Sequence, residues 1–252
     1  MPVIGVINQK GGVGKTTSAI NLAAALADHR QVLLIDLDPQ ANASSGLGIW
    51  EPERTVYDVL VGHQPARRVI TETEIGNLSI LPASSELAGA AMELDATSEN
   101  MLLLSKALMG VRPKFDIIVL DSPPSIGALT LNSLSAADLL IIPLQAEYYA
   151  LEGIAGMLDT VDRVQDSLNS DLVILGILIT MYDTRTKLSQ QVEENVRNHF
   201  GKLVFDTVIP RNVRLAEAPS FGKAIFEFAP SSQGAAAYRK LAKEVLERVS
   251  KA

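Results

Sequence analysis

A glycine-rich stretch near the start of the chain has the residues of a phosphate-binding loop. It reads NQKGGVGKTT from Asn8, and its lysines Lys10 and Lys15 are five positions apart. The glycines let the backbone curl with its N–H groups inward, and the helix expected after them adds a positive dipole end. We expect Lys15 to reach the β- and γ-phosphates of a nucleotide and the Thr16 hydroxyl to ligate Mg²⁺. The predicted phosphate-binding residues are Lys10, Gly11, Gly12, Val13, Gly14, Lys15, Thr16 and Thr17. The alternative is a glycine-rich turn with incidental lysines.

Carboxylates follow two of the predicted strands. Asp36 ends the segment Val32–Asp36 and Asp38 comes two residues later, while Asp121 ends the apolar run IIVLD. Open α/β sheets bind their ligands just beyond the carboxyl ends of their strands. Asp121 is therefore a candidate for the Mg²⁺ site beside the loop. The open alternatives are a turn at Asp38 and a helix-capping role for Asp121.

These residues need a parallel sheet to bring them together, and the sequence predicts one. Apolar runs rich in β-branched residues alternate with helix-length segments, as in sheets covered by helices on both faces. The predicted strands are Val3–Asn8, Val32–Asp36, Leu78–Leu81, Ile117–Asp121, Leu139–Pro143, Leu172–Thr180 and Leu203–Ile209. The predicted helices cover residues 15–28, 55–62, 86–109, 126–136, 150–168, 186–199 and 234–250. We expect one α/β domain over residues 1–252.

Composition narrows the class of protein. The 252 residues are 47% hydrophobic, which is enough for a sizeable core. The absence of cysteine excludes disulfides, thiolate zinc sites and cysteine-ligated iron–sulfur clusters. No apolar run approaches about 18 residues and the N-terminus has no signal-peptide pattern, so we expect a cytoplasmic protein.

Charge is unevenly distributed along the chain. The formal net charge is −7, yet residues 181–252 contain 12 Lys and Arg against 8 Asp and Glu. This basic C-terminal third is consistent with an anion-binding face. A chance excess on solvated helices is the alternative.

The loop departs from the standard phosphate-loop pattern, because Gln9 occupies the position of its first glycine. The stretch KGGVGKTT resembles the deviant Walker A loop of the ParA/MinD superfamily of ATPases. That resemblance implies ATP and Mg²⁺ as cofactors and a dimer that sandwiches the nucleotide, with Lys10 reaching the partner's phosphates. Hydrolysis would then depend on dimerisation, as with an arginine finger. Lys10 and Gly11 would lie at the dimer interface, where a bulky side chain at Gly11 would block the approach.

The resemblance also implies roles for the carboxylates and for two later segments. It places Asp38 in switch I, orienting the attacking water, and Asp36 near the metal behind its direct ligands. The segment LIIPLQAEYYALEG is similar to one found in Soj/ParA-type members, which makes Glu147 a candidate for contact with the opposite subunit or its nucleotide. We expect Tyr148 and Tyr149 to serve in packing rather than base stacking.

Two loops that follow predicted strands resemble the adenine-binding loops of the family. This resemblance implies that the residues near the adenine ring are Thr180, Met181, Pro210 and Asn212. The same loops carry basic residues, and family members of this type bind double-stranded DNA without sequence preference through such side chains. The candidates are Arg185, Lys187, Arg211, Arg214 and Lys223. The alternative is that these arginines are paired with carboxylates such as Asp183 and Glu217.

The resemblance runs from Val3 to the last helix and implies a nucleoid-associated chromosome- or plasmid-partitioning ATPase with a ParB/Spo0J-type partner. The chain begins almost at its first strand, so we expect no operator-reading extension. A MinD-like membrane ATPase is the alternative. The stripe of Tyr238, Leu241, Val245 and Val249 lacks large inserting aromatics, so we predict a core-docked last helix and no stable membrane association. A relative of the nitrogenase iron protein is excluded by the missing cysteines.

Overall fold

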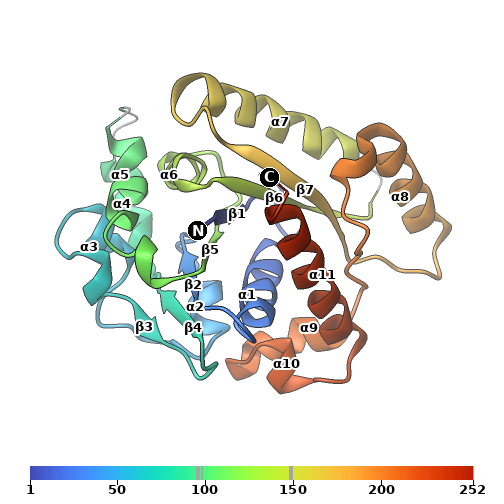
Figure 1. The fold of residues 1–252 in the computed structure, drawn as a ribbon, viewed down its shortest axis with the longest axis horizontal. Helices are drawn as coiled ribbons and strands as arrows, with labels where there is room; N and C mark the ends of the chain where they lie inside the picture. Colours follow the sequence, from blue (N-terminus) through green and yellow to red (C-terminus); the bar gives the residue numbers. More distant parts are fainter. Residues whose placement is uncertain (95–96, 98, 148–149, 252) are drawn as a thin grey trace.

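The computed structural model describes residues 1–94, 97, 99–147 and 150–251. A seven-stranded sheet with the order β3-β4-β2-β5-β1-β6-β7 lies at its centre (Figure 1). The strands are β1 (Val3–Val6), β2 (Val32–Asp36), β3 (Thr71–Glu72), β4 (Leu78–Leu81), β5 (Ile117–Asp121), β6 (Leu139–Gln145) and β7 (Val173–Thr180). Every pairing is parallel except that of the edge strand β3 with β4.

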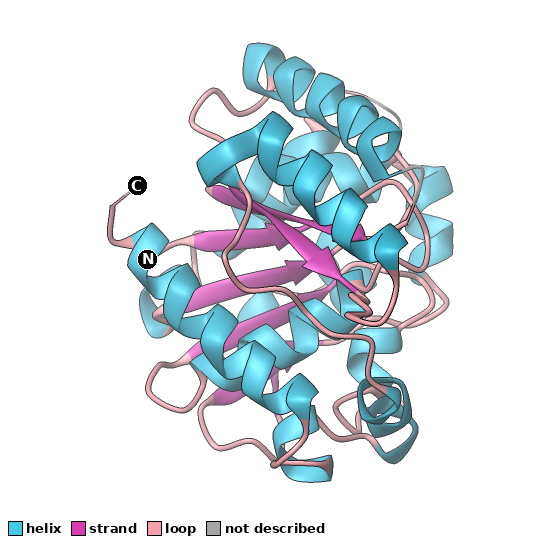
Figure 2. Ribbon diagram, turned by 90° about the vertical axis from the view of Figure 1, so that its right-hand side faces the viewer, coloured by secondary structure: helices cyan, strands magenta, loops and turns pink. Residues whose placement is uncertain are grey.

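The strands form from uninterrupted apolar runs, because helices cover both faces of the sheet. Figure 2 shows the sheet between two layers of helices. All residues of β1, β2 and β5 are buried, as expected for a parallel sheet with no solvated face. The three carboxyl ends therefore meet at one edge.

Two helical layers complete the core. One layer packs on the face that includes Ile4, Leu34 and Val119. It consists of α1 (Lys15–Leu26), α2 (Asn42–Ser45), α9 (Val213–Glu217), α10 (Ile225–Phe228) and α11 (Gln233–Val249). The opposite layer consists of α3 (Val56–Leu60), α4 (Leu87–Glu93), α5 (Leu103–Leu108), α6 (Ala128–Ala136), α7 (Ala150–Ser167) and α8 (Lys187–Phe200). Short 3₁₀ helices are η1 (Ala66–Arg68), η2 (Asn100–Leu102), η3 (Arg112–Lys114), η4 (Gly201–Leu203) and η5 (Ala218–Phe221).

The last helix is docked on the core, as predicted. Tyr238, Leu241 and Val245 on α11 are at most 1% exposed, and the Tyr238 hydroxyl lies 3.1 Å from the hydroxyl of Ser18 on α1. The apolar stripe of α11 is thus occupied by α1 and the sheet (Figure 1). Within the described residues, no helix is both long and apolar enough to cross a membrane.

The predicted strand Leu203–Ile209 is wrong. Only Val204 forms a bridge to β7 there, and the amides of Phe205 and Ile209 donate to the carbonyls of Ile177 and Ile179. The four-residue step from Phe205 to Ile209 thus matches a two-residue step on β7, from Ile177 to Ile179, so the segment bulges. The carboxylate of Glu244 accepts the intervening amides of Asp206 and Thr207 at 2.8 and 2.9 Å, which replaces strand pairing.

The single helix predicted over residues 86–109 is also wrong, since α4 ends at Glu93 and α5 begins only at Leu103. The side chain of Asn132 on α6 accepts from the Leu104 amide at 3.0 Å and donates to the Asn100 carbonyl at 2.8 Å. It thereby takes backbone groups that a continuous helix pairs internally. The short elements β3, α2, α9 and α10 were not predicted because each is only two to five residues long.

Candidate nucleotide-binding site

The glycine-rich loop lies at the carboxyl edge of the sheet, where β1 ends between β5 and β6. Gly12 has φ of 75° and Gly14, the residue before α1, has φ of 86°. Both values lie in the left-handed region that residues with a Cβ rarely adopt. The glycines therefore allow the tight turn that leads from β1 into α1.

Hydrogen bonds from distant segments hold the loop in this shape. Asn8 donates to the carbonyl of Pro143 on β6 at 2.7 Å and accepts from the amide of Lys10 at 2.9 Å. The hydroxyl of Thr180 on β7 donates to the Val13 carbonyl at 2.8 Å. Thr180 thus serves the loop as well as the cavity beside it.

Gln9 is a functional-site residue whose contacts the sequence did not reveal. Its side-chain amide donates to the Gly156 carbonyl at 3.0 Å and to the Thr160 hydroxyl at 2.9 Å, both on α7. The residue that replaces the usual first glycine therefore ties the loop to a helix about 150 positions later. No local pattern signals such a partner.

The two loop lysines have different surroundings. Lys15 is 7% exposed, and its ammonium group donates to the Lys10 carbonyl at 2.9 Å. Burial lowers the pKa of Lys15, while the nearby carboxylates of Asp121 and Asp38 raise it. Lys10 instead extends to the surface, where its ammonium group lies 3.5 Å from a carboxylate oxygen of Glu147. Lys15 therefore points into the loop of its own chain, whereas Lys10 lies at the surface beside Glu147.

Asp121 is a buried carboxylate without a hydrogen-bonded partner. Neither of its oxygens has one at hydrogen-bonding geometry among the described residues, and the residue is fully buried. Burial raises the pKa of Asp121 well above its ordinary value, and the negative charge of Asp36 raises it further. The adjacent Thr16 hydroxyl and the Lys15 charge act in the opposite direction. The Thr16 hydroxyl is close enough to lower the pKa of Asp121 but leaves both carboxylate oxygens without a hydrogen bond of standard geometry within the described part of the chain, so the carboxylate can take a further ligand.

A magnesium ion fits this donor set. Asp121 and Thr16 offer a carboxylate and a hydroxyl oxygen side by side, and hard cations prefer oxygen ligands. The described residues contain no group of three or more acidic, histidine or cysteine side chains that could hold a metal alone. Mg²⁺ at nucleotide sites needs no such group, because it keeps several waters and binds substrate phosphates.

The carboxylate of Asp36 accepts several hydrogen bonds, unlike that of Asp121, although the two residues are register partners on adjacent strands. Its carboxylate accepts the Ser44 amide at 2.8 Å, the Ser44 hydroxyl at 2.7 Å and the Asp38 amide at 3.1 Å. Burial raises the pKa of Asp36 to about 6, against these hydrogen bonds. Both oxygens of Asp36 are thus occupied by hydrogen bonds that organise the following segment, and its expected place near a metal stays a prediction.

Asp38 begins a tight turn beside the loop. Its carboxylate accepts the Gln40 amide at 2.9 Å, its carbonyl accepts the Ala41 amide at 2.8 Å, and Ala41 has φ of 52°. The predicted turn is therefore present, and it also holds the Asp38 carboxylate close enough to Lys15 to affect the lysine pKa. The role of Asp38 in orienting a water stays a prediction.

The four predicted adenine residues line one cavity of about 340 Å³ next to the loop. Thr180, Met181, Pro210 and Asn212 share it with Gly14 and Thr17 and with an apolar wall of Ile209, Val213 and Leu215. Met181 has φ of 51°, a strained value for a residue with a Cβ, and such strain is concentrated at ligand sites. The volume lies in the range typical of small-molecule sites.

The predicted basic residues lie on adjoining loops, but two of them are paired. Arg185 forms two hydrogen bonds to the Asp183 carboxylate at 2.7 and 2.9 Å, and Arg214 binds Glu217 at 2.8 Å. The Arg211 amide donates to the Tyr182 carbonyl, which joins the two loops, and the Arg211 charge lowers the pKa of Asp183. Lys187 starts α8, and Lys223 lies beyond η5.

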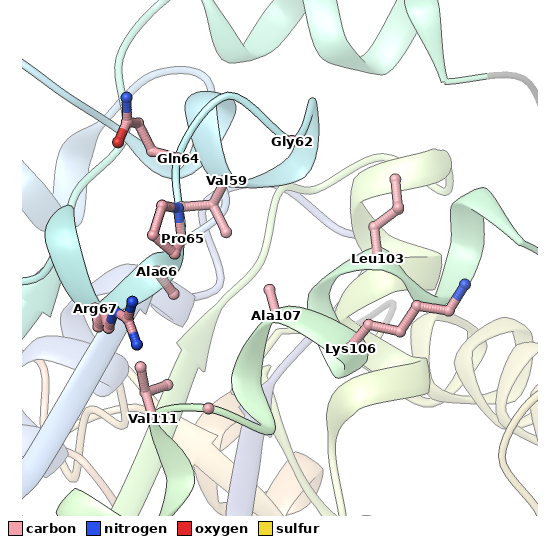
Figure 3. Close-up of a pocket in the computed structure, with 11 residues that line it drawn as sticks. Val59, Gly62, Gln64, Pro65, Ala66, Arg67, Leu103, Lys106, Ala107 and Val111 are labelled. Atoms are coloured by element: carbon pink, nitrogen blue, oxygen red, sulfur yellow. The ribbon is translucent and has the colours of Figure 1, made fainter.

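Two further predictions concern Glu147 and the pair Tyr148 and Tyr149. Glu147 follows β6 and contacts Lys10 of its own chain, and its other oxygen accepts a short hydrogen bond from Gln145. Tyr148 and Tyr149 lie outside the described residues. A cavity of about 590 Å³ lies elsewhere, between the end of α3, η1 and α5, with Arg67 and Lys106 on opposite sides (Figure 3). None of the predicted site residues lines it.

The geometry agrees with comparisons to known proteins. A family model described as "AAA domain" matches residues 1–174. The chain is 54% identical over 250 residues to a chromosome-partitioning ATPase Soj from Thermus thermophilus, covering 99% of this chain and 97% of that protein. It is 51% identical to the sporulation initiation inhibitor protein Soj of Bacillus subtilis, covering 96% and 97%.

A solved structure is similar over the same extent. A Mycobacterium smegmatis protein described as cobyrinic acid a,c-diamide synthase, with bound ADP and magnesium, superimposes with a TM-score of 0.87. It is 37% identical and covers 99% of this chain and 96% of its own. The sheet and loop seen here are therefore compatible with a bound magnesium nucleotide in a protein of this fold.

Proposed function

Because the chain belongs to the Soj/ParA family of chromosome-partitioning ATPases, we propose that it hydrolyses ATP with Mg²⁺ as a nucleotide-sandwich dimer. The ATP-bound dimer binds double-stranded DNA without sequence preference. A centromere-bound partner of the ParB/Spo0J type stimulates hydrolysis, and the dimer then separates and leaves the DNA. We do not propose the synthase activity by which the mycobacterial structure is described, because the relatives with higher sequence identity are partitioning proteins.

The observation that carries the proposal is the unpaired carboxylate of Asp121 beside Lys15 and Thr16. Burial makes the charged form of the Asp121 carboxyl unfavourable, and a cation beside it would favour that charged form and gain an oxygen ligand. A phosphate loop with such a carboxylate at its base supports Mg²⁺–nucleotide binding. The cavity lined by Thr180 and Met181 supports a base beside the same loop.

The chain's own residues would perform the reaction by positioning and charge. Water attacks the γ-phosphorus while the bond from this phosphorus to the β–γ bridging oxygen breaks, giving ADP and phosphate. Asp38 turns from the Gln40 amide to orient that water, and Lys15 moves from the Lys10 carbonyl to the β- and γ-phosphates. Thr16 and Asp121 would hold Mg²⁺, which would supply positive charge to the phosphate oxygens. No step changes the covalent structure of the protein.

Dimerisation would bring Lys10 to the nucleotide of the facing subunit as an additional cation. Lys10 is 40% exposed on its side chain and lies at the surface of the loop, so it can reach a nucleotide on a facing subunit. A charge delivered only in the dimer makes hydrolysis depend on assembly. Gly11 has no atom within 4 Å of the position where a Cβ would stand, which leaves the loop surface open to a second copy.

The DNA-binding part of the proposal is supported by the adjoining loops with Arg185, Arg211 and Arg214. Phosphate contacts need charge and reach rather than a reading helix, and a dimer doubles each contact. The guanidinium groups of Arg185 and Arg214 are accessible, with 84% and 60% of their side chains exposed. The single-contact pair of Arg214 with Glu217 contributes about 0–1 kcal/mol, so a phosphate competes with it readily, whereas the bidentate pair of Arg185 with Asp183 is harder to displace.

A titration with unrelated DNA duplexes tests the proposal. Binding is measured without nucleotide, with ADP and with ATP, and in parallel with liposomes. We expect ATP-dependent binding to every duplex and hydrolysis that releases it. ATP-dependent liposome binding without DNA affinity would favour the MinD-like alternative instead. Lys106→Glu, at an exposed site away from the loop, is a charge-change control.

A further inference from the structure

We propose that Ser44 is a positioning residue for Asp38, acting through the buried carboxylate of Asp36. The inference rests on the proposed hydrolytic role of Asp38 and adds a residue that neither touches the nucleotide site nor belongs to the predicted motifs. Ser44, in the one-turn helix α2, is fully buried.

The first step is the link from Ser44 to Asp36. One carboxylate oxygen of Asp36, Oδ2, accepts both the amide and the hydroxyl of Ser44, at 2.8 and 2.7 Å. Hydrogen bonds to a buried charge are among the stronger ones in proteins. Asp36 itself is fully buried on β2, so these bonds set the orientation of its carboxylate.

The second step is the link from Asp36 to Asp38. The other oxygen, Oδ1, accepts the backbone amide of Asp38 at 3.1 Å. The carboxylate therefore connects the start of the turn at Asp38 with Ser44, six residues further along the chain. Between them Ala41 takes its left-handed conformation, and its amide donates to the Asp38 carbonyl. The whole segment is a closed loop whose two ends meet at Asp36.

A hydrogen bond between Ser44 and Ala83 fixes this loop to the sheet. The Ser44 hydroxyl, while donating to Asp36, accepts the backbone amide of Ala83 at 2.9 Å. Ala83 follows β4, the strand that pairs with β2, and is 1% exposed. A hydroxyl is needed here because only a group that both donates and accepts can serve Asp36 and Ala83 at once.

We expect loss of the Ser44 hydroxyl to lower the rate of ATP hydrolysis, and not only the stability of the fold. Without the hydroxyl, the Asp36 carboxylate loses one of two donors on Oδ2, and the Ala83 amide is left unpaired. The turn can then shift, and displacement of a water-orienting group by about 1 Å reduces turnover by up to about a hundredfold. Lys15 and the Thr180 side of the cavity are held by contacts that do not involve Ser44, so we expect nucleotide affinity to be preserved.

The test compares Ser44→Ala, Ser44→Thr and Ser45→Ala by steady-state ATPase kinetics. Ser45 lies in the same helix, but its hydroxyl donates only to the Ala41 and Asn42 carbonyls, at 3.0 and 3.5 Å. We expect Ser44→Ala to lower kcat by roughly ten- to a hundredfold with KM for ATP changed less than about twofold. Ser44→Thr should recover most of kcat, and Ser45→Ala should resemble the wild type.

A double-mutant cycle with Asp38→Ala separates positioning from general damage. If Ser44 acts through Asp38, adding Ser44→Ala to Asp38→Ala lowers kcat no further; multiplicative losses overturn the inference. Wild-type kcat in Ser44→Ala also overturns it, provided Asp38→Ala is slow. Fast turnover in Asp38→Ala would instead overturn the proposed role of Asp38 itself. If Ser44→Ala does not fold, Ser44→Cys, with a weaker donor, carries the same comparison and should show an intermediate kcat.

Discussion

The ammonium group of Lys10 lies 3.5 Å from the carboxylate of Glu147 in the same chain. Both side chains are about half exposed, so the pair is screened by solvent and holds the lysine only weakly. The lysine that is proposed to act in the opposite subunit thus has an intramolecular partner that it must leave.

Lys10→Ala should therefore abolish ATP-dependent dimerisation while ATP still binds the monomer. Glu147→Gln should leave dimerisation intact or strengthen it by a few fold, because it removes the competing charge. Light scattering with ATP and with ADP measures both. An unchanged dimer in Lys10→Ala would exclude the role in trans, and a lost dimer in Glu147→Gln would give Glu147 an intersubunit contact of its own.

Gly11 offers a separate test of the dimer. A Cβ at Gly11 would meet no atom within 4 Å, so Gly11→Leu should change the stability of the monomer by less than about 0.5 kcal/mol. In a face-to-face dimer the same side chain would block the approach of the partner loop. We expect normal melting and no dimer. Gly76→Leu, also in open space, is the control; dimerisation by Gly11→Leu would contradict the proposed face.

Arg214 and its partner Glu217 test the DNA face in opposite directions. Arg214→Glu should weaken binding to all duplexes alike and reduce the salt slope by about 1–2, since a dimer carries two copies. Glu217→Gln frees the guanidinium and should strengthen binding slightly. Arg163→Glu on the exposed surface of α7 is the charge-matched control. An unchanged salt slope in Arg214→Glu would place the contacts elsewhere.

The two raised carboxyl pKa values predict a pH dependence of stability for the protein without nucleotide or Mg²⁺. Burial raises the pKa of Asp36 to about 6 and that of Asp121 in the same direction, from an ordinary value of 3.8. A carboxyl group with a raised folded-state pKa binds its proton more tightly in the folded state. Its stabilising contribution is complete below the unfolded value and is lost as the pH rises through the folded value.

Asp121→Asn should therefore melt higher than the wild type at pH 8, and this advantage should shrink toward pH 4.5. Each tenfold difference in proton affinity between the folded and unfolded states corresponds to about 1.4 kcal/mol, or roughly 2–5 °C in a protein of this size. The variant should also lose the stabilisation that Mg²⁺ with ATP gives the wild type. Asp159→Asn, exposed on α7, is the control. Equal melting of Asp121→Asn and wild type at both pH values would contradict the assignment of Asp121.

The parallel sheet and its loop could be predicted because their signals are local. The boundaries of β2, β4 and β5 were predicted to the residue, since buried parallel strands are continuous apolar runs. The segment Leu203–Ile209 has the same composition but is not a strand, because Glu244 takes two of its amides. A competitor almost forty residues away leaves no mark in the segment itself.

The sequence by itself determined the fold class, the phosphate loop and the residues that could meet at the carboxyl edge of the sheet. Only the family resemblance separated Asp36 from Asp121, because the two aspartates end adjacent strands in the same register and their local sequence gives no physical reason for different roles. Only the tertiary structure decided that Ser44 satisfies Asp36 while Asp121 remains open beside Thr16. The physical reason is that a buried charge takes its character from hydrogen-bond donors brought in by other elements, and chain folding alone places them.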